Sequence, residues 1–223
     1  MRLLERLPRE NGRDYALRVL KENIISLDLA PGSPISESEL ALQMGLSRTP
    51  VREALIELSK VKIVEIIPQK PSRVARINYD LVEESRYLRK ILECSIIELV
   101  CSMASPQDIA CLEENIQLQN FYLERSSAEQ LMIMDNQFHA MLFDIAHKSQ
   151  IYALTQNFSI HFDRVRRMAL ESVKDIKIVA DHAAILDAVR AIRPEQAREL
   201  MEVHLTRYKV DAKAIRERYP EFF

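Results

Sequence analysis

The chain has 223 residues, of which 48% are hydrophobic and 29% charged, a balance typical of globular domains with enough apolar material for a core. No uncharged apolar run reaches the length of about 18 residues that a membrane span needs. Residues 1–13 lack the apolar centre of a secretory signal, so we expect a cytoplasmic protein. Cys94, Cys101 and Cys111 form no C-x-x-C pair and are expected to be free thiols, the first two buried.

The net formal charge is −2, but the basic residues are concentrated near the N-terminus. Residues 1–77 hold 13 basic and 10 acidic side chains, and residues 45–76 hold seven and three. Phosphate contact requires such a local basic surface. By charge alone, an ordinary solvated face is an equally good interpretation.

The first predicted helix covers residues 13–27. Its apolar stripe, at helical spacing, consists of Leu17, Leu20, Ile24 and Leu27. Pro31-Gly32 then predicts a turn.

Two short helices are predicted next. Ser36 and Glu39 have the spacing of a capping box, and Gly45 stands where a left-handed C-terminal cap is expected. Ser47 is positioned to cap the following helix, in whose first turn Pro50 is tolerated. This pattern predicts a helix-turn-helix.

After residue 62 the pattern changes to that of strands. The β-branched residues at 63–67, the interruption at 68–71 and the apolar Val74 and Ile77 predict a β-hairpin. Three helices followed by a hairpin describe a winged helix-turn-helix domain, which we assign to residues 1–77.

Residues 78–223 are helical in pattern to the end and are assigned to a second domain. Expected helices start at Asn78 or Asp80 and run to Met103, then cover about 107–125, 128–147, 150–171, 176–192 and 195–218. Short polar connections favour antiparallel neighbours, and therefore a helix bundle. The predicted fold class is mainly α: an N-terminal winged helix-turn-helix plus a C-terminal all-α antiparallel bundle.

The second helix of the helix-turn-helix carries the side chains suited to reading DNA. Its N-terminal end offers free N–H groups and a positive dipole, and arginine can bind guanine with two hydrogen bonds. The candidate DNA-binding residues are Ser47, Arg48, Thr49 and Arg52 at this end, together with Ser38 on the preceding helix.

Three motifs resemble the GntR family of bacterial regulators: Pro31-Gly32, Glu37-Ser-Glu-Leu-Ala41 and Ser47-Arg-Thr-Pro-Val-Arg-Glu-Ala-Leu55. The resemblance covers about 60 residues and implies a homodimer that binds an inverted-repeat operator on double-stranded DNA, with the recognition helix in the major groove and the wing tip at the minor groove. Lys62 replaces the glycine that commonly precedes the hairpin, and Pro71 stands where many members have glycine.

The segment Lys70-Pro-Ser-Arg73 resembles the wing of the fatty-acid-responsive members of the family. This likeness makes Lys70, Ser72 and Arg73 candidate wing contacts to DNA. An exposed basic turn is the alternative interpretation.

Asp135 and His139 lie one helical turn apart on a face that points into the bundle. Buried Asp and His side chains are costly unless they are paired or bound to a metal. With His182 and His204, they form a set that can bind one divalent ion. Without further information, a structural Asp–His hydrogen bond is the more common role of such a pair.

Residues 78–223 resemble the FCD effector domain of one large GntR subfamily, in the Asp-x-x-Phe-His segment, the Asp-His-x-x-Ile-Leu-x-Ala segment and the late His-Leu. The resemblance implies that Asp135, His139, His182 and His204 bind Zn, Ni or Mn. It also implies a small organic acid as effector, with Arg89 and Glu93 as effector-binding residues. An internal Arg89–Glu93 bridge is an equal alternative.

We therefore expect a transcription repressor or activator that is not an enzyme. Two other interpretations remain open at this stage: a purely structural metal, and a helical-bundle metalloenzyme with a DNA-binding appendage, in which Asp and His activate water.

Overall fold

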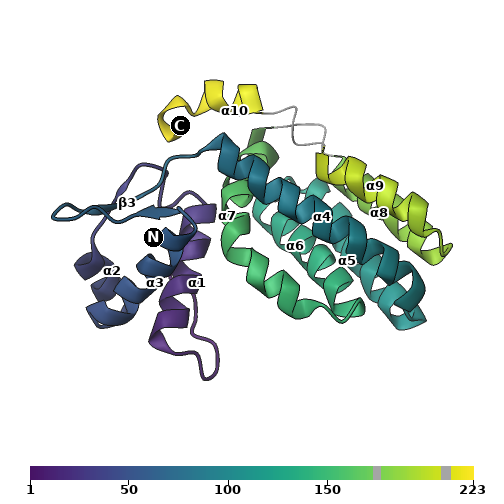
Figure 1. Ribbon diagram of the computed structural model, residues 1–223, viewed down its shortest axis with the longest axis horizontal. Helices are drawn as coiled ribbons and strands as arrows, with labels where there is room; N and C mark the ends of the chain where they lie inside the picture. Colours follow the sequence, from purple (N-terminus) through teal and green to yellow (C-terminus); the bar gives the residue numbers. More distant parts are fainter. Residues whose placement is uncertain (173–176, 207–211) are drawn as a thin grey trace. The chain divides into compact units, whose positions relative to one another are not determined.

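The computed structural model describes residues 1–172, 177–206 and 212–223, which fall into two compact units (Figure 1). The first, here called the head unit, comprises Met1–Val82, Ile160–Val165 and Ala214–Phe223. The second, the bundle unit, comprises Glu83–Ser159 and Arg166–Lys213. The predicted boundary after residue 77 therefore lies a few residues before the change of unit at residue 83. The sequence did not lead us to expect residues 160–165 and 214–223 in the head unit.

The N-terminal part of the head unit consists of three helices and a small sheet. In chain order the elements up to residue 74 are α1 (Gly12–Ile25), β1 (Pro34–Ile35), α2 (Glu37–Met44), α3 (Arg48–Lys60), β2 (Val64–Glu65) and β3 (Ser72–Val74). This is the order of a winged helix-turn-helix, as the sequence predicted.

Helix α1 is shorter than predicted at its C-terminal end. Asn11 caps its first turn by accepting a hydrogen bond from the backbone N–H of Asp14. The helix ends at Ile25, and Leu27 adopts a left-handed φ of 68°. The prediction that Leu27 continues the helical stripe was therefore wrong, because a left-handed residue ends the helical backbone.

The turn between α2 and α3 has the predicted caps with one exception. The Ser36 hydroxyl accepts from the N–H of Glu39, and Gly45 is left-handed at φ 65°. Ser47 occupies the N-cap position of α3 but makes no side-chain capping bond. The predicted capping role of its hydroxyl is thus not observed, and the side chain is exposed.

The wing is a three-stranded antiparallel sheet in the order β1-β3-β2. The predicted hairpin is present as β2 and β3, with Val64 opposite Val74. Strand β1, which pairs Ile35 with Ser72, was not predicted because two residues carry no alternating pattern. Lys62 is left-handed at φ 58°, a backbone conformation that glycine adopts without steric cost.

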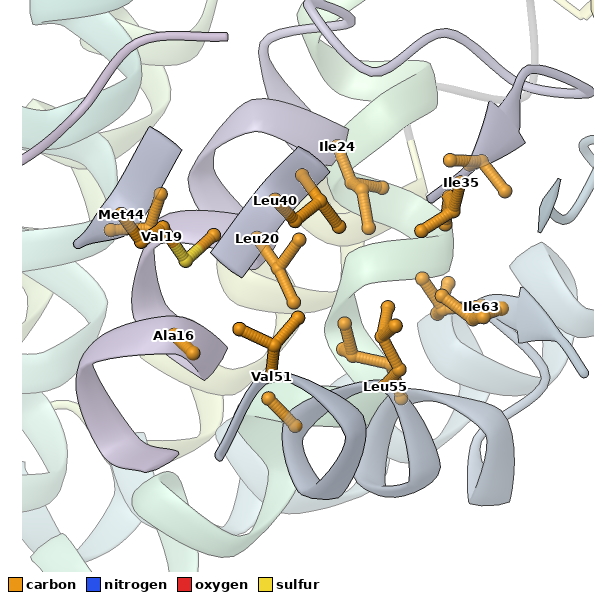
Figure 2. Close-up of a cluster of buried hydrophobic side chains, with 14 of the residues drawn as sticks. Ala16, Val19, Leu20, Ile24, Ile35, Leu40, Met44, Val51, Leu55 and Ile63 are labelled. Atoms are coloured by element: carbon orange, nitrogen blue, oxygen red, sulfur yellow. The ribbon is translucent and has the colours of Figure 1, made fainter. Parts of the chain in front are cut away.

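The head unit is held together by one apolar cluster (Figure 2). Leu20 of α1 lies between Leu40 of α2 and the side chains Val51 and Leu55 of α3. Burial of each such aliphatic side chain contributes about 2 kcal/mol. Ile160, far along the chain, is fully buried in the same cluster. The recognition helix α3 is therefore fixed from behind, and its opposite face remains exposed.

His161 follows Ile160 in the head unit, and its Nε2 lies 2.6 Å from the carbonyl oxygen of Val61. Burial is the main reason that the pKa of His161 is lowered from 6.5 to about 4. The hydrogen bond to Val61 opposes this shift, and the positive charges of Arg164 and Lys62 add to it. In the unfolded chain the imidazole takes up its proton near pH 6.5. The contribution of neutral His161 to the free energy of unfolding is therefore fully present above pH 6.5 and is lost as the pH falls to about 4.

From this group alone, we expect the free energy of unfolding to fall by at most roughly 3 kcal/mol across that window. Denaturant unfolding of the wild type and His161→Gln between pH 4 and 7 measures this dependence. The variant should depend less on pH in this range, and equal pH dependence in the two proteins would contradict the assignment.

The bundle unit consists of long helices that run side by side (Figure 1). The remaining helices among the described residues are α4 (Tyr79–Met103), α5 (Pro106–Glu124), α6 (Ala128–Ile145), α7 (Ser149–Ser172), α8 (Ile178–Arg190), α9 (Pro194–Thr206) and α10 (Ala212–Arg218), followed by a 3-10 turn η2 (Pro220–Phe222). Ser105 and Asp108 form a capping box at the start of α5. The predicted last helix, 195–218, crosses residues 207–211, which lie outside the described residues.

Cys94 and Cys101 are buried, as predicted, and Cys111 is exposed. Burial raises the pKa of Cys94 to about 11, so its thiol is protonated and unreactive at neutral pH. Among the described residues, no helix is both long and apolar enough to cross a membrane.

Candidate functional site

The N-terminal end of α3 presents an exposed polar surface. The side chains there that the sequence singled out, together with one from α2, are all exposed: Ser38, Ser47, Arg48, Thr49 and Arg52. Arg48 forms a 3.6 Å ion pair with Glu37, and its side chain is 70% exposed. A surface pair of this kind is weak, so the guanidinium is free to move to a phosphate or a base.

The wing presents only part of its predicted set. Lys70 and Arg73 are exposed, and Arg73 pairs with Glu65 at 2.6 Å across the hairpin. Ser72 is buried at 9% exposure, because it faces inward where β3 pairs with β1. Its side chain is therefore not on the outer surface of the wing.

Asp135 and His139 of α6, His182 of α8 and His204 of α9 converge in the bundle unit. All four are at most 3% exposed, and one ligand atom from each lies within 4.8 Å of the others. The Nε2 of His204 is 3.2 Å from that of His182 and 3.3 Å from that of His139. Asp135 Oδ1 lies 3.6 Å from His182 Nε2 and 3.9 Å from His139 Nε2.

The other ring nitrogen of each histidine faces an acceptor. His139 Nδ1 contacts a carboxylate oxygen of Glu93 on α4. His182 Nδ1 lies 2.7 Å from the amide oxygen of Gln119 on α5, and His204 Nδ1 lies 3.5 Å from a carboxylate oxygen of Asp181. A neutral imidazole carries one proton, so each Nδ1 that donates leaves an Nε2 with a lone pair.

With the proton on Nδ1 of each ring, three Nε2 lone pairs and one carboxylate oxygen point at one another. Groups that only accept cannot hydrogen-bond to each other, and a cation among them satisfies all four. Burial lowers the pKa of His139 and His182 well below 6.5, so both rings are neutral, as metal ligands must be. The donor set therefore fits a divalent metal ion.

Asp135 is ionised in this setting. Burial is the largest single influence and would raise the pKa of its carboxyl. The charges of Arg166, His139, His182 and Arg89 together outweigh burial, with Arg166 contributing most of the four, and they hold that pKa below its usual range. Arg166 on α7 is 2.5 Å from Asp135 Oδ2 and also contacts the side-chain oxygen of Asn136. Oδ1 of Asp135 is left facing the histidines.

Arg89 and Glu93, the expected effector-binding pair, are engaged with each other. Arg89 Nε lies 2.5 Å from Glu93 Oε1, and the second oxygen of Glu93 faces His139. The internal bridge considered from the sequence is therefore present. Glu93 orients a candidate metal ligand, a role that its sequence position did not indicate.

Gln119 is a residue that sequence reasoning missed. Its amide nitrogen donates to Asn115 Oδ1 at 2.6 Å, and Asn115 donates in turn to the Met134 carbonyl. These bonds fix the Gln119 oxygen toward His182 and fix which nitrogen of His182 carries the proton. Its signal in the sequence is only a buried polar position on α5, four residues after another.

Replacing Gln119 with leucine is expected to weaken metal binding by roughly 10- to 100-fold, as loss of a partner behind a metal-bound histidine does. Gln119→Glu retains an acceptor for His182 Nδ1 and should bind metal more tightly than Gln119→Leu. Competition with a chromogenic chelator measures both. Equal affinities for the two variants would exclude this role.

Both the DNA-binding part and the helical part of the chain match known protein families. Residues 16–74 match the bacterial regulatory proteins of the gntR family, and residues 84–207 match the FCD domain. An uncharacterized HTH-type transcriptional regulator in an unstable DNA locus of Streptomyces ambofaciens is 33% identical over 216 residues, covering 96% of this chain and 90% of that protein. The HTH-type transcriptional repressor RspR of Escherichia coli K12 is 28% identical over 207 residues, covering 92% and 91%.

The fold is also that of a solved structure. Escherichia coli McbR/YncC superposes with a TM-score of 0.79 at 20% sequence identity, covering 94% of this chain and 99% of that one. The winged helix-turn-helix and the helical domain together define a DNA-binding transcription regulator. The chain belongs to the GntR family, with an FCD domain after its DNA-binding domain. It is a regulator, and not a metalloenzyme with a DNA-binding appendage.

Proposed function

We propose that this regulator binds an inverted-repeat operator as a homodimer and that its bundle unit holds a divalent metal ion and senses a small carboxylic acid. The metal site would consist of Asp135, His139, His182 and His204. The observation that carries this proposal is the convergence of three Nε2 atoms and one carboxylate oxygen, with a side-chain oxygen near the other ring nitrogen of each histidine. When bound, the ion would supply a Lewis-acidic centre for a carboxylate oxygen.

The charges around the site favour an anionic effector. Asp135, Glu93 and Asp181 supply three carboxylates, and Arg89 and Arg166 supply two guanidinium groups. A divalent cation would leave this set with a formal charge of +1. A buried excess of positive charge attracts a carboxylate. Nitrogen and oxygen ligands are suited to Zn, Ni or Mn.

The exposed arginines at the start of α3 would enter the major groove, with Lys70 and Arg73 of the wing at the backbone or the minor groove. A two-fold dimer presents two recognition helices related by the same symmetry, so its operator should be an inverted repeat. The effector would alter DNA affinity through a difference in its affinity for two arrangements of the dimer. Light scattering of the purified chain measures the dimer directly.

Thermal unfolding with a panel of mono-, di- and tricarboxylic acids tests the effector class. Each acid is added to metal-loaded protein and to chelator-treated protein, with uncharged amides of the same acids as matched controls. We expect at least one acid, and none of the amides, to raise the Tm of the metal-loaded protein alone. Acids that raise the Tm equally without metal would indicate a purely structural ion, and no response to any acid would reject this effector class.

A further inference from the structure

Residues 160–165 lie in the part of the sequence that matches the FCD domain, yet they are part of the head unit. Ile160 is fully buried in the same apolar cluster as Val51, Leu55 and Leu58 of the recognition helix. The head that reads DNA is therefore completed by a short stretch of α7. Two polar side chains of that stretch make specific contacts with it.

His161 holds the end of the recognition helix. Its Nε2 lies 2.6 Å from the carbonyl oxygen of Val61, the C-cap residue of α3. A carbonyl only accepts, so Nε2 carries the proton and donates it. Carbonyls in the last turn of a helix have no partner within the helix, and this bond satisfies one of them at a partly buried position.

Arg164 holds the base of the wing. The residue is fully buried, and its Nη1 donates to the carbonyl oxygen of Ala75 at 2.7 Å. Ala75 in turn donates from its N–H to the carbonyl of Ile63, which closes the hairpin at its base. Burial lowers the pKa of Arg164 only to about 10, so its guanidinium is charged at neutral pH and makes a charge-assisted bond.

The two carbonyl oxygens flank the wing. Val61 directly follows the recognition helix, and Ala75 directly follows β3, so the hairpin of residues 62–74 is held at both ends by one turn of α7. We infer that His161 and Arg164 are positioning residues for DNA reading. They fix the wing relative to the recognition helix, so that both can meet one operator half-site at the same time.

DNA binding by full-length variants tests this role. Arg164→Met removes the donor and keeps most of the volume, Arg164→Lys keeps a donor, and Arg198→Met is a matched control at an exposed position of α9. Fluorescence anisotropy at one salt concentration would measure two probes: a duplex selected by the wild type from a random library, and an unselected duplex of equal length. The readout is the ratio of the two affinities, because loss of folded protein lowers both affinities alike.

We expect Arg164→Met to lower affinity for the selected duplex by roughly tenfold, comparable to one mismatched base pair. Affinity for the unselected duplex should stay within about twofold, since phosphate contacts dominate it. Arg164→Lys should recover part of the ratio, and Arg198→Met should leave it unchanged. An unchanged ratio in Arg164→Met, or the same loss in Arg198→Met, would overturn the inference. If Arg164→Met does not fold, His161→Leu and His161→Gln make the same comparison at Val61.

Discussion

His182→Ala is expected to abolish metal binding and leave a folded protein that still binds DNA. His182 is fully buried at the centre of the four-residue set, with its Nε2 3.2 Å from that of His204 and 3.6 Å from Asp135 Oδ1. Removal of a partner behind a ligand costs roughly 10- to 100-fold in affinity, so removal of the ligand itself should cost more than about 100-fold. Elemental analysis of the purified variant measures the loss.

The substitution also removes packing, because the imidazole stacks on Phe138 with ring centroids 4.0 Å apart. His182→Gln retains more volume and separates the loss of the ligand from the loss of packing. His147→Ala, at an exposed position outside the set, is the control and should keep its metal. A His182→Ala protein with one equivalent of metal per chain would eliminate the proposed site.

Arg48→Ala and Arg52→Ala should each weaken operator binding by roughly 1–3 kcal/mol. Both side chains are exposed at the N-terminal end of α3, and the ion pair of Arg48 with Glu37 is too long and too exposed to hold it. Neither side chain contributes to the apolar cluster, so the fold should be unaffected. Titration of a selected duplex with each variant measures the change.

The salt dependence of DNA binding distinguishes contacts to phosphates from contacts to bases. A lost phosphate contact should lower the slope of log affinity against log salt by about one, and a lost base contact should relax specificity at one position. Arg198→Ala serves as the control, since Arg198 pairs with Glu98 on the surface of the bundle unit. Wild-type affinity in both Arg48→Ala and Arg52→Ala would contradict docking through this helix.

Much of the head could be predicted because its signals are local. Ser36, Gly45 and Pro50 mark helix ends within a few residues, and the structure has helix ends at those places. Strand β1 could not be predicted, because its pairing with β3 depends on residues almost forty positions away. The inward direction of Ser72 follows from the same pairing, so a pattern within the wing could not reveal it.

The candidate metal ligands were predictable in part from spacing and in part from resemblance. The i,i+4 spacing of Asp135 and His139 places both on one face of α6, but no local pattern shows which other helices pack against that face. The partners Gln119, Glu93 and Arg166 come from α5, α4 and α7, and their roles depend on tertiary packing. The same reason explains why residues 160–165 were not expected in the head unit.

Selection of duplexes from a random library by the full-length, metal-loaded protein tests the central claim most directly. The account predicts enrichment of an inverted repeat whose half-sites are about one helical turn apart, or a multiple of it, and loss of that enrichment in Arg48→Ala or Arg52→Ala. No enrichment over random competitor, even at low salt and with carboxylic acids supplied, would contradict it.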